Sequence, residues 1–238
     1  MAASGDMVEY QSRSAVTNEP DEYALEEALA LRGKRGGQVT VISMCPPQSE
    51  DILRTALAKG ADQAIRIDGN YSDADRTSLL LAETIRGLEF DLILAGTESL
   101  DNMASQVAVA VGSRLGIPFV FGVTSVALSG TRTATVTKEL GGGSYEVLEV
   151  GLPALLCVQT GTQRLSFVPF AKLVQARRRP IQCISIGDLR LGQHSLDGKP
   201  GFGVLDVFRP KSTHAIEMLS GSTSGVASRV TDIIERAR

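Results

Sequence analysis

One turn of the chain combines small, hydroxyl-bearing and acidic side chains where α/β proteins bind ligands. It reads Gly96-Thr-Glu-Ser-Leu-Asp101-Asn-Met-Ala-Ser-Gln106 and follows the apolar run Asp91-Leu-Ile-Leu-Ala95. The pattern predicts a helix from about Asn102 to Leu115, so the turn joins the carboxyl end of a strand to a helix N-terminus. Parallel α/β sheets bind ligands at that edge, and free amides at a helix N-terminus attract phosphate. The turn is therefore a candidate phosphate-binding loop.

An ordinary βα turn explains the same pattern, with Asp101 as the N-cap of the helix. The chain has neither a GxGxxG motif nor a P-loop lysine, so neither common nucleotide-binding loop is indicated. If the turn does bind phosphate, backbone amides at the helix start are its main donors. Thr97, Ser99 and Ser105 would add hydroxyl donors. The local pattern leaves both interpretations open.

The other reactive side chains do not form a recognisable catalytic or metal site. Cys45, Cys157 and Cys183 are far apart, and neither His194 nor His214 lies at zinc-ligand spacing from a cysteine or from the other histidine. Cys45 follows a predicted strand and is best interpreted as a small buried thiol. No nucleophile elbow is present, so the sequence indicates no self-contained hydrolase or dehydrogenase.

Composition excludes several classes of protein. The 238 residues are 43% hydrophobic and 21% charged, which is ordinary for a globular protein and excludes disorder over most of the chain. A net charge of −3, no tryptophan and only 5% aromatic residues argue against a nucleic-acid binder. No apolar run reaches the roughly 20 residues that span a bilayer, and the N-terminus lacks a signal-peptide core. We expect a cytoplasmic protein, or one of a compartment like the mitochondrial matrix.

Strands and helices alternate through the first half of the chain, which predicts a parallel sheet with helices on both faces. The predicted helices cover about 20–35, 49–60 with Ser49 as cap, a stretch that includes 79–85, and 102–115; the strands cover 39–43, 63–67 and 91–95. The last of these strands is short and wholly apolar, which indicates a central strand buried on both faces.

The second half changes character after Phe119. Strands are predicted at 120–126, 131–139, 145–150 and 154–159, and the first three form an antiparallel excursion. A basic helix end follows at 173–179, then a Gly-, Ser- and Pro-rich arm at 187–225 and a final helix at about 224–238. The predicted fold is α/β with a Rossmann-like, mostly parallel sheet. We predict a nucleotide-binding-type domain at 1–183 and a partner-contacting arm and helix at 184–238.

Four stretches of this chain resemble the beta subunit of electron transfer flavoproteins. They are Asn18-Glu-Pro-Asp-Glu-Tyr-Ala-Leu-Glu-Glu-Ala28; Val39-Thr-Val-Ile-Ser-Met-Cys-Pro-Pro-Gln48 with Leu53-Arg-Thr-Ala-Leu-Ala-Lys-Gly-Ala-Asp62; Phe90-Asp-Leu-Ile-Leu-Ala-Gly96 with Asp101 and Gln106-Val107; and Leu173-Val-Gln-Ala-Arg-Arg-Arg-Pro-Ile181. Their order and spacing match from Asn18 to the final helix. The residues in these stretches are most similar to those of the nitrogen-fixation and electron-bifurcating branches of the family.

The resemblance implies a heterodimer with an alpha subunit that carries the redox FAD. It implies that the beta subunit shapes the FAD site and holds AMP or a second FAD. Electrons would pass between flavin dehydrogenases and a quinone or ferredoxin-type acceptor. The alternative is a structural subunit of a larger oxidoreductase that has lost its nucleotide. A third reading is a stand-alone nucleotide-binding module of related fold.

Site residues follow from the resemblance by position. The implied nucleotide-binding residues are Asn18, Pro20, Asp21, Met44, Gly96, Thr97, Glu98, Ser99, Asp101, Asn102, Ser105, Gln106 and Val107. The implied partner-recognition residues are Phe167, Phe170, Arg177, Arg178 and Arg179.

This sequence also departs from the family pattern. The family opens with a hydrophobic strand that has no counterpart here, so we expect a misplaced start codon, a strand from another chain, or a truncated sheet. In the nucleotide loop, Thr97 replaces a basic residue and Asn102-Met-Ala104 replaces an acidic, hydroxyl-bearing run. Ala108 replaces a glycine, and Gln163-Arg-Leu-Ser-Phe167 stands where the family recognises dehydrogenases. These changes weaken the expectation of tight nucleotide binding.

Overall fold

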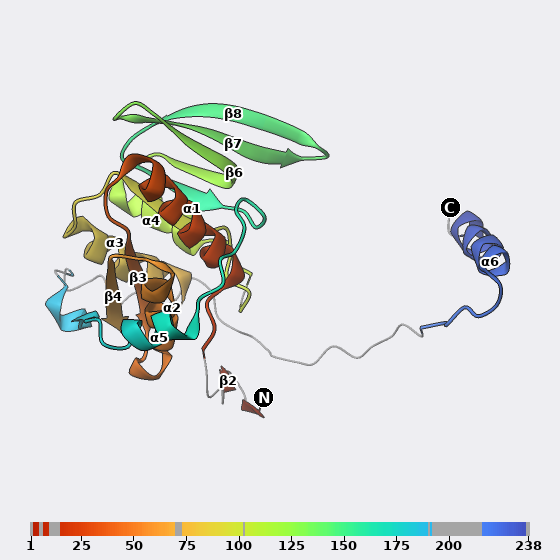
Figure 1. Ribbon diagram of the computed structural model, residues 1–238, viewed down its shortest axis with the longest axis horizontal. Coiled ribbons are helices and arrows are strands. Elements are labelled where there is room, and N and C mark those ends of the chain that lie inside the picture. The colour runs from red at the N-terminus through yellow and green to blue at the C-terminus, as the bar shows by residue number, and fades with distance from the viewer. Residues whose placement is uncertain are drawn as a thin grey trace. The chain divides into compact units, whose positions relative to one another are not determined.

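The computed structural model describes residues 2–4, 7–9, 15–69, 73–101, 103–189, 191 and 216–236 (Figure 1). The chain divides into two compact units. The larger is Gln11–Gly203, and the smaller combines Met1–Tyr10 with Val204–Arg238. The predicted boundary between residues 183 and 184 remains a prediction.

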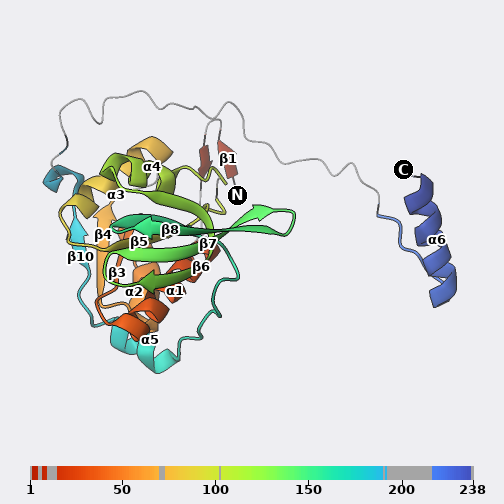
Figure 2. The same cartoon turned by 90° about the horizontal axis from the view of Figure 1, so that it is seen from above.

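The larger unit contains two sheets. The first is parallel, in the order β10-β4-β3, and the second is mixed, in the order β5-β9-β6-β7-β8 (Figure 2). Their strands are β3 (Thr40–Cys45), β4 (Gln63–Asp68), β5 (Leu92–Gly96), β6 (Phe119–Ser129), β7 (Thr133–Gly141), β8 (Ser144–Gly151), β9 (Ala154–Val158) and β10 (Gln182–Ile184). β5, β9 and the first part of β6 run parallel, whereas β6, β7 and β8 pair antiparallel. The predicted α/β fold with an antiparallel excursion is confirmed.

Five α-helices belong to this unit. They are α1 (Glu19–Arg35), α2 (Asp51–Lys59), α3 (Ala74–Arg86), α4 (Val107–Leu115) and α5 (Phe170–Ala176). Pro20 and acidic residues open α1, three basic residues close it, and Gly36 ends it at φ 76°, a conformation that glycine adopts without strain. Short 3₁₀ turns lie at Pro47–Ser49 and Ile186–Asp188.

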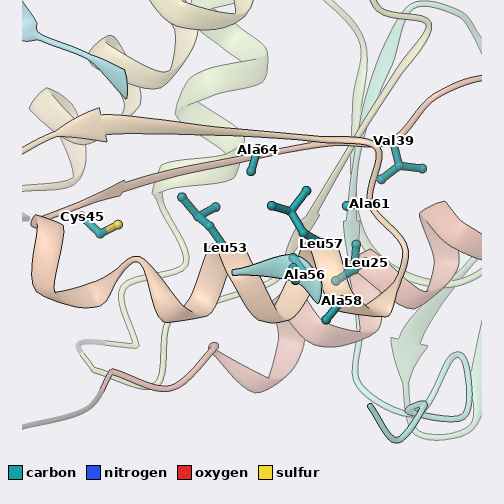
Figure 3. Close-up of a cluster of buried hydrophobic side chains, with 10 residues drawn as sticks. Leu25, Val39, Cys45, Leu53, Ala56, Leu57, Ala58, Ala61 and Ala64 are labelled. Atoms are coloured by element: carbon teal, nitrogen blue, oxygen red, sulfur yellow. The ribbon is translucent and has the colours of Figure 1, made fainter. Parts of the chain in front are cut away.

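Helices cover the strands through three apolar clusters. One joins Leu25 of α1 to Leu53 and Leu57 of α2 and to Val39 and Ala64 beside β3 and in β4 (Figure 3). A second lies under the antiparallel strands, and the third packs α3 and α4 on β9. α2 buries its apolar face, as its spacing predicts, because residues three and four apart share one side of a helix.

Four sequence predictions need correction. The run 91–95 is not a central strand, because β5 stands at the end of its sheet. α4 begins at Val107 rather than near 102, because Met103 and Ser105 adopt positive φ and interrupt a helix there. Ser49 lies in the 3₁₀ turn and does not cap α2. β10 was not predicted, since three residues give too short a pattern.

The smaller unit contains strands β1 (Ala2–Ser4) and β2 (Met7–Glu9), which pair antiparallel, and helix α6 (Thr223–Arg236). The predicted final helix is confirmed, and its apolar Val230, Ile233 and Ile234 are exposed. Most of the predicted arm, 192–215, lies outside the described residues. No described helix is long and apolar enough to cross a membrane.

Candidate functional site

The start of α1 packs directly on the carboxyl end of β5. The Gly96 amide donates a hydrogen bond of 2.7 Å to Asp21 Oδ1. A Cβ at Gly96 would lie 2.7 Å from Pro20 Cβ and 2.8 Å from the Asp21 nitrogen, so only glycine fits there. The predicted Pro20, Asp21 and Gly96 therefore meet although they are far apart in sequence.

Asn18 connects the same helix start to the loop after β5. Its Nδ2 donates to the Glu98 carbonyl at 2.7 Å and to Asp21 Oδ2 at 2.8 Å. Its Oδ1 accepts from the Leu100 amide at 3.0 Å. All three polar contacts of this one side chain hold the loop against α1, so the position needs both a donor and an acceptor.

The loop 97–106 is tightly turned. The Met103 amide donates to the Ser99 carbonyl at 2.8 Å, and Met103 and Ser105 have φ values of 51° and 53°. Ser105 Oγ donates to Glu98 Oε2 at 3.2 Å, and Ser99 Oγ accepts from the Asp101 amide at 3.3 Å. Of the three predicted hydroxyl donors, Ser105 thus donates within the loop, whereas Ser99 accepts there and keeps its own O–H. The Thr97 hydroxyl has no hydrogen bond to another described residue.

The N-terminus of α4 can accept an anion. Its N-cap is Gln106, which makes no side-chain capping bond, and its first turn contains no acidic residue. The expectation that Asp101 caps the helix is wrong, because Asp101 lies five residues before the N-cap. The first amides of a helix have no intrahelical acceptor, so those of Val107 and the next two residues suit a phosphate.

Three further predicted nucleotide residues occupy different settings. Met44 lies near the carboxyl end of the parallel strand β3, where its side chain is 3.8 Å from the position of a Cβ on Gly69. Val107 packs against the α3–α4 cluster. Asn102 lies outside the described residues.

A second polar cluster, which sequence reasoning missed, fixes the segment before α5. Glu26 Oε1 accepts from the Ser166 amide at 3.0 Å and from Ser166 Oγ at 2.7 Å. Lys59 Nζ lies 2.9 Å from the same oxygen, and Gln163 Nε2 donates to Glu27 Oε2 at 2.7 Å. We call Glu26, Glu27, Lys59, Gln163 and Ser166 the anchor cluster.

Glu26 stays charged in this cluster. Burial by itself raises the pKa of a carboxyl group, but the hydrogen bonds from Ser166 and Lys59 outweigh that effect and lower the pKa of Glu26. The sequence did carry a signal. Glu26 and Glu27 stand between the apolar residues Leu25 and Ala28, next to the face of α1 that packs on the core, and both are buried. Buried carboxylates require partners.

The predicted partner-recognition residues separate into two groups. Phe167 and Phe170 expose 89% and 75% of their surface, and Arg177 and Arg178 are also exposed. Arg179 instead turns inward, where it donates to the Ala61 carbonyl at 2.8 Å and to the Asp62 carbonyl. Arg179 therefore holds α5 against the turn after α2.

The two buried cysteines are not activated thiols. Cys45 and Cys157 are buried, as expected for Cys45. Burial raises the pKa of Cys45 and raises the pKa of Cys157 to about 12. Both are therefore thiols at neutral pH.

The matched region covers most of the chain. Residues 7–187 match the family model described as "Electron transfer flavoprotein domain". The chain belongs to the electron transfer flavoprotein family. The predicted resemblance to its beta subunits is confirmed, because curated beta subunits align over nearly the whole sequence.

Three relatives with different names are similar to this electron transfer flavoprotein subunit over most of its length. "Electron transfer flavoprotein subunit beta" of Bacillus subtilis is 30% identical over 92% of this chain and 85% of its own. "Protein FixA" of Azorhizobium caulinodans is 33% identical over 85% and 76%. "Caffeyl-CoA reductase-Etf complex subunit CarD" of Acetobacterium woodii is 32% identical over 88% and 81%.

Proposed function

We propose that this chain is the beta subunit of an electron transfer flavoprotein heterodimer. It pairs with an alpha subunit that carries the redox FAD, shapes that FAD site and holds an adenine nucleotide, AMP or a second FAD. The heterodimer carries electrons between flavin dehydrogenases and a quinone or ferredoxin-type acceptor. The observation that carries the proposal is the family match over 7–187, which includes the loop and helix start described above.

The nucleotide would bind through its phosphate at the N-terminus of α4. The absence of a capping side chain and of acidic residues from the first turn supports this placement. Two acidic side chains at the loop already accept hydrogen bonds, since Asp21 accepts from the Gly96 amide and Glu98 accepts from Ser105. The Thr97 and Ser99 hydroxyls and the α4 amides remain as donors. A bound flavin would supply the redox chemistry, and this chain's part is to bind and orient it.

A matched pair of variants tests the phosphate position. Gln106→Glu and Gln106→Met both keep the length of the side chain at the exposed start of α4, but only Gln106→Glu adds a negative charge beside the amides. We expect the purified heterodimer to lose about tenfold of its nucleotide affinity with Gln106→Glu and to keep it with Gln106→Met. Nucleotides released by denaturation are identified by mass spectrometry. Equal retention by both variants would place the phosphate elsewhere.

The structural-subunit alternative also has support. Ser105, one of the three hydroxyls expected to donate to phosphate, already donates to Glu98 within the loop. A wild-type heterodimer that assembles with its alpha subunit and releases no adenine nucleotide would favour this alternative.

The partner surface is proposed from exposed residues of the segment that the anchor cluster fixes. Phe167 and Phe170 would insert into a redox partner, because a buried phenylalanine contributes roughly 2–3 kcal/mol. Arg177 and Arg178 would steer an acidic surface toward them. Arg179 is left out of this surface because it binds backbone carbonyls of its own chain.

A further inference from the structure

The chain that leads from β9 into α5 presents two exposed aromatic side chains from an irregular segment. β9 ends at Val158, α5 begins at Phe170, and residues 159–169 form neither helix nor strand. Phe167, within this segment, and Phe170, at its end, are both largely exposed. Because no helical or strand ladder of backbone hydrogen bonds holds the segment, its conformation depends on side-chain contacts.

Two consecutive carboxylates of α1 supply these contacts. Glu26 Oε1 accepts hydrogen bonds from the backbone amide and from the hydroxyl of Ser166, at 3.0 Å and 2.7 Å. Glu27 Oε2 accepts from Gln163 Nε2 at 2.7 Å. Hydrogen bonds to charged groups are stronger than those between neutral groups. The segment is thus fixed at two points, and the second point directly precedes Phe167.

The two carboxylates are themselves held in place. Glu26 and Glu27 expose only 9% and 3% of their surface, and Lys59 Nζ of α2 lies 2.9 Å from Glu26 Oε1. The helices that carry these residues share one apolar cluster, through Leu25 of α1 and Leu57 of α2 (Figure 3). Buried polar groups with satisfied hydrogen bonds make a structure rigid. The carboxylates are therefore a fixed support for the segment.

Apolar contacts hold the residues next to the aromatic ones. Val168 and Leu173 pack against the same cluster of α1 and α2, whereas Phe167 and Phe170 stay exposed. The backbone beside both phenylalanines is therefore held, although their own side chains are not buried. A side chain that is in place before docking loses less conformational entropy on binding, and this strengthens association.

We propose that Ser166 and Gln163 are positioning residues for the docking of a redox partner. Bound to the carboxylates of α1, they hold Phe167 and Phe170 where an apolar pocket of a flavin dehydrogenase would receive them. This inference rests on the proposed electron-carrier function. The positioning residues act through the two phenylalanines, so they should affect docking and leave the electron-transfer step itself unchanged.

Removal of the Ser166 hydroxyl tests this role. The probe is a flavin dehydrogenase purified from the source organism by its ability to reduce the wild-type heterodimer; its reduced flavin is oxidised as the heterodimer's flavin is reduced. The rate is measured against the concentration of heterodimer. We expect Ser166→Ala to raise KM about fivefold with kcat and flavin content unchanged, because one hydrogen bond to a charged group is lost. Ser166→Thr, the matched control, keeps a hydroxyl and should keep the wild-type KM.

A double variant separates positioning from stabilisation of the fold. If Ser166 acts through Phe170, Ser166→Ala should raise KM less than about twofold in a chain that already carries Phe170→Ala. The same rise in KM in both backgrounds would overturn the proposal. So would a Ser166→Ala protein that melts at a lower temperature and has the wild-type KM, because its hydroxyl would then only stabilise the fold.

Gln163→Ala gives an independent measurement at the other point of attachment, and its KM should also rise with kcat unchanged. Failure of this inference can be told apart from failure of the proposed function. A wild-type heterodimer that no flavin dehydrogenase reduces would overturn the electron-carrier function and the positioning role with it. An active wild type, with unchanged KM for both Ser166→Ala and Gln163→Ala, would overturn the positioning role alone.

Discussion

Strands β9 and β5 are neighbours in one sheet, and they have almost the same composition. β9 reads Ala-Leu-Leu-Cys-Val and β5 reads Leu-Ile-Leu-Ala-Gly, and Leu94 lies directly opposite Leu156. Every residue of β9 is buried, yet four of the five in β5 are half-buried. The difference lies in the second neighbour: β9 has one in β6, whereas β5 has none among the residues that the structure describes. Two strands of similar composition can therefore differ in burial because they differ in the number of strands that pair with them.

The largest effect is expected from truncating the two paired leucines. Leu156→Ala should lower the free energy of unfolding by about 2–5 kcal/mol, because Leu156 is fully buried. Leu94→Ala should cost about half as much, because its side chain is only half-buried. Urea unfolding of the two variants measures both costs.

Equal losses in free energy of unfolding for Leu94→Ala and Leu156→Ala would mean that the free edge of β5 is already covered in solution.

The second effect compares the carboxyl end of β5, which has one neighbouring strand in the described structure, with that of β4, which has two. Gly96→Ala should destabilise the protein by about 1–3 kcal/mol, because the new Cβ would overlap backbone atoms at the start of α1. Gly69→Ala, just after β4, is the matched control, since its Cβ would meet Met44 at an ordinary 3.8 Å. Thermal unfolding compares the two. A Gly96→Ala protein as stable as the control would contradict the close packing of α1 on β5.

The third effect concerns the anchor cluster, which contains no residue of β5 or β9. Glu26→Gln should cost about 1–3 kcal/mol, because it leaves the buried Lys59 with a weaker partner. The pKa of Glu26 is lowered in the folded protein, so its contribution is complete above its ordinary pKa near 4.5 and is lost as the pH falls through the lowered value.

Unfolding is measured at a series of pH values. The difference in free energy of unfolding between wild type and Glu26→Gln should become smaller as the pH falls below about 4.5. Hydrogen exchange should quicken in 159–169 and stay unchanged in β5. If the difference in free energy of unfolding does not change with pH, the charge of Glu26 does not stabilise the segment before α5.

The smallest effect on stability is expected at the exposed aromatic residues. Phe170→Ala should change the free energy of unfolding by less than about 0.5 kcal/mol, because 75% of its surface is already exposed. Stopped-flow electron transfer with a redox partner should slow, while assembly with the alpha subunit and flavin content stay the same. Unfolding of this variant, or unchanged kinetics, would remove Phe170 from the partner surface.

The candidate site was only partly predictable from the sequence. The loop after β5 was predicted from its own residue pattern, whereas Asn18, Pro20 and Asp21 came from the resemblance. The structure brings the loop and these residues together through hydrogen bonds. The helix start was misplaced to residue 102, because positive φ at Met103 and Ser105 has no signature in those residue types. Arg179 was grouped with its two neighbours, since a run of three arginines does not show which one turns inward.

The sequence by itself determined the order and kind of most elements. Apolar periodicity, Pro20 and Gly36 fix α1, and alternation with glycine turns fixes the hairpin of β7 and β8, because these signals act over a few residues. Only the tertiary structure decided which strands have two neighbours. Pairing joins residues far apart in the chain, such as Leu94 and Leu156, and a buried apolar strand has the same local pattern whether one of its edges or both are closed.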